Sequence, residues 1–514
     1  MNLDSGSLSL EQKIGQMLMF GFTGYEPSGE FLELFKKNHL GNIVFFARNI
    51  KNAEHLKVLT QQFHFKTDIP PFLAIDQEGG TVIRIFEGAS LLPGNMAVAS
   101  TGEPELVRKY GEITGRELRA LGININLAPV LDVNKPENPG IGVRSLGEDP
   151  ETVSGFGVEM IKGMKSEGIF TTAKHFPGLG SADFDTHLEF PVINRSMEQL
   201  ESVDLVPFKN AVDSGIDLVM TTHAGYPAFS KSSKVLPATF TKEILTGYLR
   251  DKMNFQGLII TDDLEMGAAM KSIGYADGLI KAVNAGADIL CVCKDINLQK
   301  EAFSILKDAV DNNIIPESRI DESIKRIFRF KQKLISNRDN FFAENINNLV
   351  HEHAPAVKKI IRKSVQVYDP EGILPLQSDN DTEYLILYPK LREFSPVEEQ
   401  QPLYGRIEKL IESELSSKIN CEFLQYNLTP NEETTSEIKQ KTENYNKIIL
   451  FSFNAHLESG QKSLITDLSE RTERFILFML RNPYDRFVSN RITASVAVFA
   501  PLEGTVKAGI DRLF

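Results

Sequence analysis

Two short segments of the sequence carry side chains that could cooperate in covalent catalysis. The first, residues 174–180, reads Lys-His-Phe-Pro-Gly-Leu-Gly and is followed by Asp185 and His187. An aspartate two residues before a histidine can orient an imidazole that acts as an acid or base. The second segment, residues 257–264, ends a hydrophobic run on Asp262 and Asp263. A carboxylate and a histidine brought together at strand ends would supply the groups for a two-step reaction through a covalent intermediate.

Polar side chains also end other apolar runs of the chain. The set consists of Asp76, Asp132, Lys174, His175, His223 and Asp262. Enzymes built on parallel barrels carry their reactive residues at the carboxyl ends of the strands. We therefore expect these six residues to gather at one edge of a single sheet.

Short apolar runs alternate with longer amphipathic stretches through the first two-thirds of the chain. Eight apolar runs are candidate strands, and several of them are continuous enough for strands buried on both faces. The eight cover residues 16–22, 42–46, 72–76, 123–133, 170–175, 218–223, 258–262 and 289–293. The clearest helices between them are expected at residues 103–121 (capped by Thr101), 149–167, 196–214 and 241–253. The alternation predicts an α/β fold, a (β/α)8 TIM-type barrel over residues 1–335. The rival, a dinucleotide-binding doubly wound sheet, lacks a Gly-x-Gly-x-x-Gly after the first strand.

A second α/β domain is expected at the carboxyl end. Residues 336–356 are rich in Asn and charge and are interpreted as a linker that leads into a helix over residues 353–363. Apolar runs then resume at residues 364–368, 384–388, 447–453, 475–480 and 494–499. We predict a smaller α/β sandwich domain over residues 357–514.

Composition excludes several classes of partner. The net charge of −13 argues against nucleic acid, which needs a basic face. Three cysteines fit a reducing compartment, and Cys291 and Cys293 are interpreted as buried strand residues, not metal ligands. No signal peptide and no apolar run of about 18 residues is visible, so we expect a cytoplasmic protein without a membrane partner. No cofactor is expected, and the sequence leaves the oligomeric state open.

Several motifs resemble those of glycoside hydrolase family 3, and in particular its β-N-acetylglucosaminidase branch. They are Asp76-Gln77-Glu78-Gly79-Gly80, the segment 174–180, Asp185-Thr186-His187 and Thr261-Asp262-Asp263-Leu264, which together cover most of residues 10–335. The start of the second domain, residues 363–376, resembles the sandwich domain of that family. The resemblance implies a retaining exo-β-N-acetylglucosaminidase that acts on peptidoglycan fragments or similar glycosides.

The resemblance also implies roles for single residues. Asp262 corresponds to the nucleophile that forms a glycosyl-enzyme, and His187, held by Asp185, corresponds to the acid/base. Six residues match sugar-binding positions, with His223 equally compatible with a hydrogen-bonded core histidine; they are Asp76, Arg84, Arg144, Lys174, His175 and His223. The sequence departs from the family pattern at Leu179, where His is usual, and at Thr81 and Leu146.

Other reactions are compatible with the same residues. Phosphate could replace water as the acceptor, because a neutral histidine does not repel a phosphate dianion as a carboxylate base would. The substrate's own acetamido group could attack in place of Asp262. A sugar-binding protein without catalysis and a β-glucosidase are two further alternatives, the latter disfavoured by the Asp-x-His loop.

Overall fold

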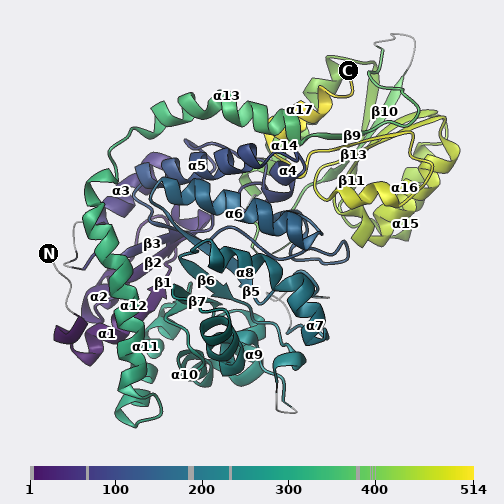
Figure 1. The fold of residues 1–514 in the computed structure, drawn as a ribbon. Helices are drawn as coiled ribbons and strands as arrows, with labels where there is room; N and C mark the ends of the chain where they lie inside the picture. The colour runs from purple at the N-terminus through teal and green to yellow at the C-terminus, as the bar shows by residue number, and fades with distance from the viewer. Residues whose placement is uncertain are drawn as a thin grey trace.

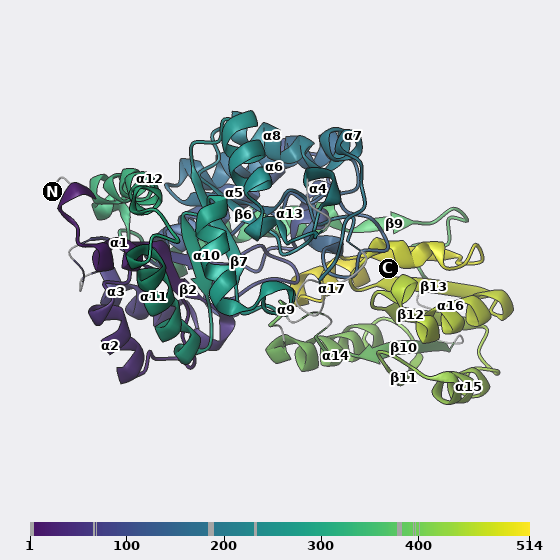
Figure 2. The ribbon, with the colours of Figure 1, turned by 90° about the horizontal axis from the view of Figure 1, so that it is seen from below.

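Two bodies of unequal size make up the molecule, and one long helix connects them (Figures 1 and 2). The computed structural model describes residues 5–514 except 65–66, 68, 183–189, 231–233, 378–382, 394, 396 and 400. No helix in this described part is long and apolar enough to cross a membrane.

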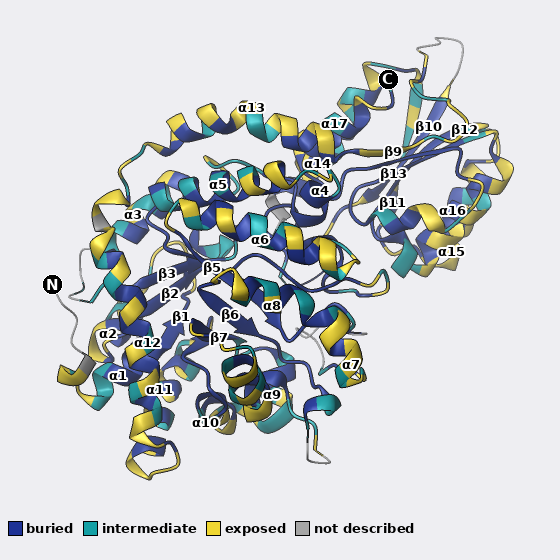
Figure 3. Cartoon of the chain, in the orientation of Figure 1, coloured by how far each residue is buried: buried dark blue, intermediate teal, exposed yellow. Residues whose placement is uncertain are grey.

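The larger body is a closed barrel of eight parallel strands, as predicted. The strands are β1 (Leu18–Phe20), β2 (Asn42–Phe45), β3 (Phe72–Ile75), β4 (Ile125–Asn126), β5 (Phe170–Phe176), β6 (Leu218–Thr221), β7 (Leu258–Asp263) and β8 (Ile289–Val292). Nearly all their residues are buried, because side chains fill the barrel and helices cover its outside (Figure 3).

Strand β4 is shorter than the apolar run over residues 123–133 predicts. After Asn126 the chain reaches Pro129, which has no N–H to continue a ladder. Pairing resumes only as an isolated bridge between Val130 and Lys174. The remainder of the run therefore forms a buried loop above the barrel, with Asp132 at its end.

Helices surround the barrel, and two of the four predicted segments, residues 103–121 and 149–167, form regular α-helices. The barrel helices are α1 (Leu10–Met17), α2 (Gly29–Lys37), α3 (Ala53–His64), α4 (Asn95–Ala99), α5 (Pro104–Ala120), α6 (Pro150–Ser166), α7 (Met197–Gln199), α8 (Val206–Asp213), α9 (Gly267–Ile273), α10 (Tyr275–Ala285), α11 (Ile296–Asp311) and α12 (Glu317–Ser336). The N-cap of α5 is Glu103, not Thr101 as predicted, because Pro104 suits the first helical position.

Two predicted helices are irregular in the structure. Residues 196–214 form α7, a π-helical turn over Leu200–Asp204 and then α8. Pro207 near the start of α8 cannot donate to the preceding turn, and this favours the interruption. Residues Glu243–Lys252 are wound as a π-helix.

The smaller body is a three-layer α/β sandwich. Its sheet has the order β11-β10-β12-β13-β14-β9, with β9 (Gln366–Tyr368) antiparallel to the rest. The other strands are β10 (Tyr384–Lys390), β11 (Cys421–Asn427), β12 (Lys447–Ser452), β13 (Arg474–Met479) and β14 (Ala494–Ala497). Alternate strand residues pack into two cores, one beneath α14 (Gln401–Ser416) and α17 (Glu503–Ile510), the other beneath α15 (Glu432–Lys441) and α16 (Ser459–Arg471).

Helix α13 (Ile346–Ser364) runs along the barrel toward the sandwich (Figure 1). It begins seven residues before the predicted start at residue 353, because Asn345 caps it by accepting a hydrogen bond from the backbone N–H of Asn348. Ile346 and Ile360 are buried in the barrel core. Half of the segment interpreted as a linker is therefore ordered helix packed on the barrel.

Candidate active site

A cavity of about 330 Å3 lies at the carboxyl ends of the barrel strands. Predicted site residues that line it are Asp76, Arg84, Arg144, Lys174, His175 and Asp262. They come from β5 and β7 and from the segments that follow β3 and β4. Because all strands are parallel, residues distant in sequence meet at this one rim.

A buried ion network forms one wall of the cavity. The Lys174 ammonium lies 2.6 Å from an Asp76 oxygen and 2.6 Å from a Glu78 oxygen. Glu78 also accepts two hydrogen bonds from the Arg144 guanidinium, at 2.8 and 3.0 Å. The Arg84 guanidinium is 3.8 Å from the second Asp76 oxygen. Sequence reasoning assigned no role to Glu78, although it stands in the Asp76–Gly80 motif.

Mutual pairing keeps this network ionised despite its burial. The Glu78 side chain is 1% exposed, and burial alone would raise its pKa, yet Arg144 and Lys174 hold that pKa well below its usual range. Burial likewise opposes the charged form of Lys174, but Asp76 and Glu78 keep its pKa raised. The network thus presents fixed charges and hydrogen-bonding groups to a polar ligand.

The two neighbouring carboxylates at the end of β7 differ in environment. An Asp262 oxygen accepts the Asp263 backbone N–H at 2.8 Å, and Asp262 lines the cavity. An Asp263 oxygen accepts backbone N–H groups of Glu265 and Cys293, at 3.1 and 3.2 Å. Burial, with the nearby Glu265 and Asp262 charges, raises the pKa of Asp263 to about 7.

His175 is oriented by Asp132, one of the six residues expected at the rim, although the sequence did not indicate this pairing. One carboxylate oxygen lies 2.7 Å from His175 Nδ1, and the other accepts the Leu179 backbone N–H at 2.6 Å. The carboxylate favours the tautomer with a proton on Nδ1. At the position where the family usually has His, the Leu179 side chain is buried in the barrel core.

His223 is fully buried and both of its ring nitrogens are engaged. Nε2 lies 3.0 Å from the Asp263 carbonyl oxygen, and Nδ1 lies 2.9 Å from the Thr239 hydroxyl. It is not among the described residues that line the cavity. The structure places it behind the end of β7, where it supports the backbone that carries the two aspartates.

Asp185 and His187 lie outside the residues that the structure describes. The described chain before them is anchored: Asn138 donates to the carbonyl oxygens of Leu179 and Ala182, at 2.9 and 3.2 Å. Their predicted roles remain predictions.

The sandwich domain also contributes to the cavity. Val397 and Glu399 line it, and the Val397 carbonyl accepts a hydrogen bond from Arg84 at 2.9 Å. Both residues follow β10 in the chain. Arg84 therefore draws its contacts from both domains.

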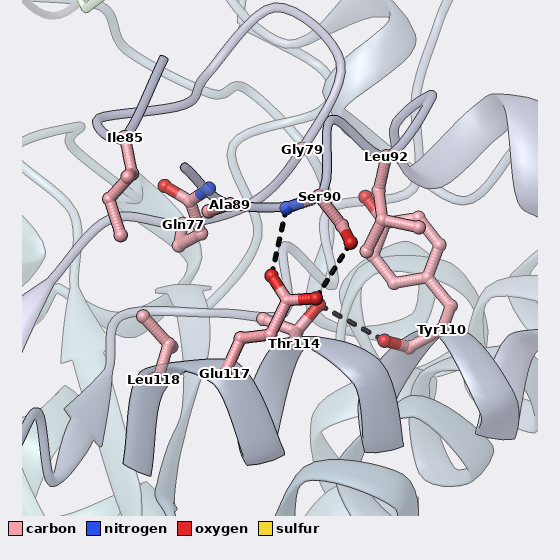
Figure 4. Close-up of a pocket in the computed structure, with 10 residues that line it drawn as sticks. All are labelled: Gln77, Gly79, Ile85, Ala89, Ser90, Leu92, Tyr110, Thr114, Glu117 and Leu118. Atoms are coloured by element: carbon pink, nitrogen blue, oxygen red, sulfur yellow. Dashed lines mark hydrogen bonds between the residues drawn. The ribbon is translucent and has the colours of Figure 1, made fainter. Parts of the chain in front are cut away.

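A much smaller cavity, of about 10 Å3, lies behind the Asp76–Gly80 motif (Figure 4). There the Glu117 carboxylate accepts hydrogen bonds from the backbone N–H and hydroxyl of Ser90, at 2.8 and 2.6 Å. His353 of α13 lies 2.8 Å from the same carboxylate. With room for about one water molecule, this space is a packing feature that braces the motif from behind.

Comparison with known proteins places this site in a family. Residues 9–330 match the model of the glycosyl hydrolase family 3 N terminal domain. The beta-hexosaminidase A of Pseudoalteromonas piscicida is 31% identical over 74% of this chain and 70% of its own length. The beta-hexosaminidase of Tolumonas auensis is 36% identical over 59% of this chain and 89% of its own. The solved structure of a family 3 beta-N-acetylglucosaminidase from Paenibacillus sp. str. FPU-7 has a TM-score of 0.87 and 33% identity, covering 98% of this chain and 96% of the other. The chain described here is a glycoside hydrolase and belongs to glycosyl hydrolase family 3.

Proposed function

We propose that this enzyme is a retaining exo-β-N-acetylglucosaminidase that removes terminal N-acetylglucosamine from peptidoglycan fragments or related glycosides. The observation that carries the proposal is the meeting of Asp262 with the Asp76–Lys174–Glu78–Arg144 network in one cavity. The relatives named beta-hexosaminidase support the choice of sugar. Three sparse cysteines fit a reducing compartment, so we place the reaction in the cytoplasm.

The proposed reaction begins with attack by the Asp262 carboxylate on the anomeric carbon. His187, oriented by Asp185, protonates the departing glycosidic oxygen, and the same imidazole then removes a proton from the water that cleaves the glycosyl ester. Asp76, Lys174, Arg144 and Arg84 hold the sugar hydroxyls and acetamido group through charge-assisted hydrogen bonds.

Asp263 tunes the charge beside the nucleophile in this proposal. A carboxyl with a pKa of about 7 is half protonated near neutral pH. Its partial neutralisation lowers the repulsion that a second full negative charge would exert on an ionised Asp262. The two adjacent aspartates can thus take different roles.

Replacement of the nucleophile tests the proposal. We expect Asp262→Asn to lower turnover of an aryl N-acetylglucosaminide by about a thousandfold or more, because the amide cannot form the glycosyl ester. Glu433→Gln, at an exposed position of α15, serves as the control. An Asp262→Asn enzyme within tenfold of the parent would end the assignment. A glycosyl ester on Asp262, trapped with a 2-fluoro substrate and located by mass spectrometry, would separate this route from attack by the acetamido group.

The acceptor of the second step distinguishes a hydrolase from a phosphorylase. We propose water, because Glu399 places a carboxylate in the cavity where a phosphate would otherwise find cationic partners. Product analysis with and without inorganic phosphate tests this choice: a sugar 1-phosphate formed by the parent enzyme would contradict it.

A further inference from the structure

The Glu399 carboxylate of the sandwich domain is bound by three groups of the barrel. The Ala47 backbone N–H donates to one of its oxygens at 2.8 Å. The guanidinium groups of Arg84 and Arg48 lie 3.6 and 3.8 Å from it. We call these three groups, the N–H of Ala47 and the side chains of Arg48 and Arg84, the cationic cradle. Two guanidiniums and a backbone N–H around one point are the donors that bind oxyanions in proteins.

The cradle has anchors that do not depend on Glu399. Arg48 donates to the carbonyl oxygens of Cys293 and Phe22, at 2.7 and 3.1 Å, and lies over the Phe46 ring with 4.1 Å to its centroid. Arg84 is 2% exposed and contacts Asp76. Loss of the Glu399 charge would therefore leave two fixed cations facing the cavity without their shared anion.

We propose that Glu399 occupies an anion-binding subsite of the barrel and thereby keeps inorganic phosphate and other oxyanions out of the sugar site. The cradle offers a phosphate oxygen the same partners as a carboxylate oxygen, and Glu399 already occupies them. A second anion beside Glu399 would also meet direct repulsion in a partly desolvated place. Glu399 is in this sense a specificity residue that favours water as the acceptor.

The anion-binding subsite does not depend on the proposed function, but its effect on the choice of acceptor rests on that function. Should phosphate enter, one of its oxygens would attack the anomeric carbon of the Asp262 glycosyl ester. A carbon–oxygen–phosphorus link forms, the bond to Asp262 breaks with its electron pair returning to the carboxylate, and a sugar 1-phosphate leaves. Glu399 prevents the binding that must precede this step.

The test titrates inorganic phosphate into the full-length parent, Glu399→Gln and the control Glu433→Gln by calorimetry, at fixed ionic strength so that screening stays constant. Glutamine keeps the size of the side chain and a carbonyl oxygen for the Ala47 N–H, and it removes the negative charge and one acceptor oxygen. We expect phosphate to bind Glu399→Gln about tenfold or more tighter than the parent, with the control unchanged. Equal affinity in parent and Glu399→Gln would overturn the proposal.

A second variant locates the bound anion. Adding Arg48→Met to Glu399→Gln should abolish the gain in phosphate affinity, and a gain that persists would refute the cradle as its site. Circular dichroism verifies the fold of each variant. Titration requires no turnover, so it decides the proposal even if the enzyme fails to cleave N-acetylglucosaminides. If it does cleave them, a sugar 1-phosphate should appear with Glu399→Gln and not with the parent.

Discussion

Glu78 is expected to matter most for both stability and catalysis, because one buried carboxylate holds two buried cations. Glu78→Gln removes the charge but almost no volume. Arg144 then keeps a 3.3 Å hydrogen bond to the Gly140 carbonyl, and Lys174 keeps its contact with Asp76. The NH2 group of the glutamine would also face the N–H groups of Arg144 and Lys174, which are donors and cannot accept a hydrogen bond from it. Breaking a buried ion pair by removing one partner costs about 3–5 kcal/mol, and we expect a loss of unfolding free energy in that range.

Urea unfolding followed by far-ultraviolet circular dichroism measures this loss, since the chain has no tryptophan for a fluorescence assay. Arg144→Gln and the double variant complete a cycle, and we expect the double variant to cost less than the two single changes added together. We also expect kcat/KM to fall by about tenfold or more, because Lys174 and Arg144 lose their positions. A Glu78→Gln protein within about 1 kcal/mol of the parent, or strictly additive costs, would refute the reasoning.

The pH dependence of the same comparison has a defined sign. The folded state lowers the pKa of Glu78, so its stabilising contribution is complete above the unfolded value of about 4.3 and is lost as pH falls through the folded value. The difference in unfolding free energy between the parent and Glu78→Gln should therefore be constant from pH 6 to pH 8 and should shrink only in strong acid.

Two further predictions concern the neighbours of this network. The folded state raises the pKa of Asp263, so its stabilising contribution is complete below the unfolded pKa of about 3.9 and is lost as pH rises toward 7. In urea unfolding, the unfolding free energy of Asp263→Asn should therefore rise by about 1 kcal/mol or more relative to that of the parent between pH 5 and pH 8. A difference in unfolding free energy that does not change with pH would contradict this. Gly79 has φ +87°, and a Cβ there would lie 1.7 Å from the Tyr110 hydroxyl oxygen. Gly79→Ala should therefore lower the unfolding free energy by about 2 kcal/mol or more, measured by the same urea unfolding. In the control Gly405→Ala in α14, a Cβ meets nothing within 4 Å, so the change should be neutral or slightly stabilising.

The barrel and most of its rim residues could be predicted because the relevant signals are local. Each buried parallel strand reads as a continuous apolar run, and the residue that ends it is fixed at the rim by the topology. Asp76, Lys174 and Asp262 followed from that rule. Strand β11 was missed because it is a partly exposed edge strand, with Glu422 and Gln425 among its residues.

The supporting residues could not be predicted because their partners are distant in the chain. The carbonyl that holds Arg84 lies 313 residues further along, in another domain. The sequence does not show that Glu78 pairs with Arg144 and Lys174. It places Asp132 and His175 at the same rim but does not show that they pair. Periodicity and motif spacing carry no information about such pairings.

The hydrogen bond from Arg84 to the Val397 carbonyl links two equilibria that would otherwise be independent. One is docking of the sandwich on the barrel, and the other is immobilisation of the Arg84 guanidinium; the same hydrogen bond stabilises both. By thermodynamic reciprocity, a ligand that binds the immobilised guanidinium also tightens the association of the two bodies, and a change that loosens their interface weakens that ligand by the same factor. Interface substitutions far from any sugar should thus be visible as changes in ligand affinity.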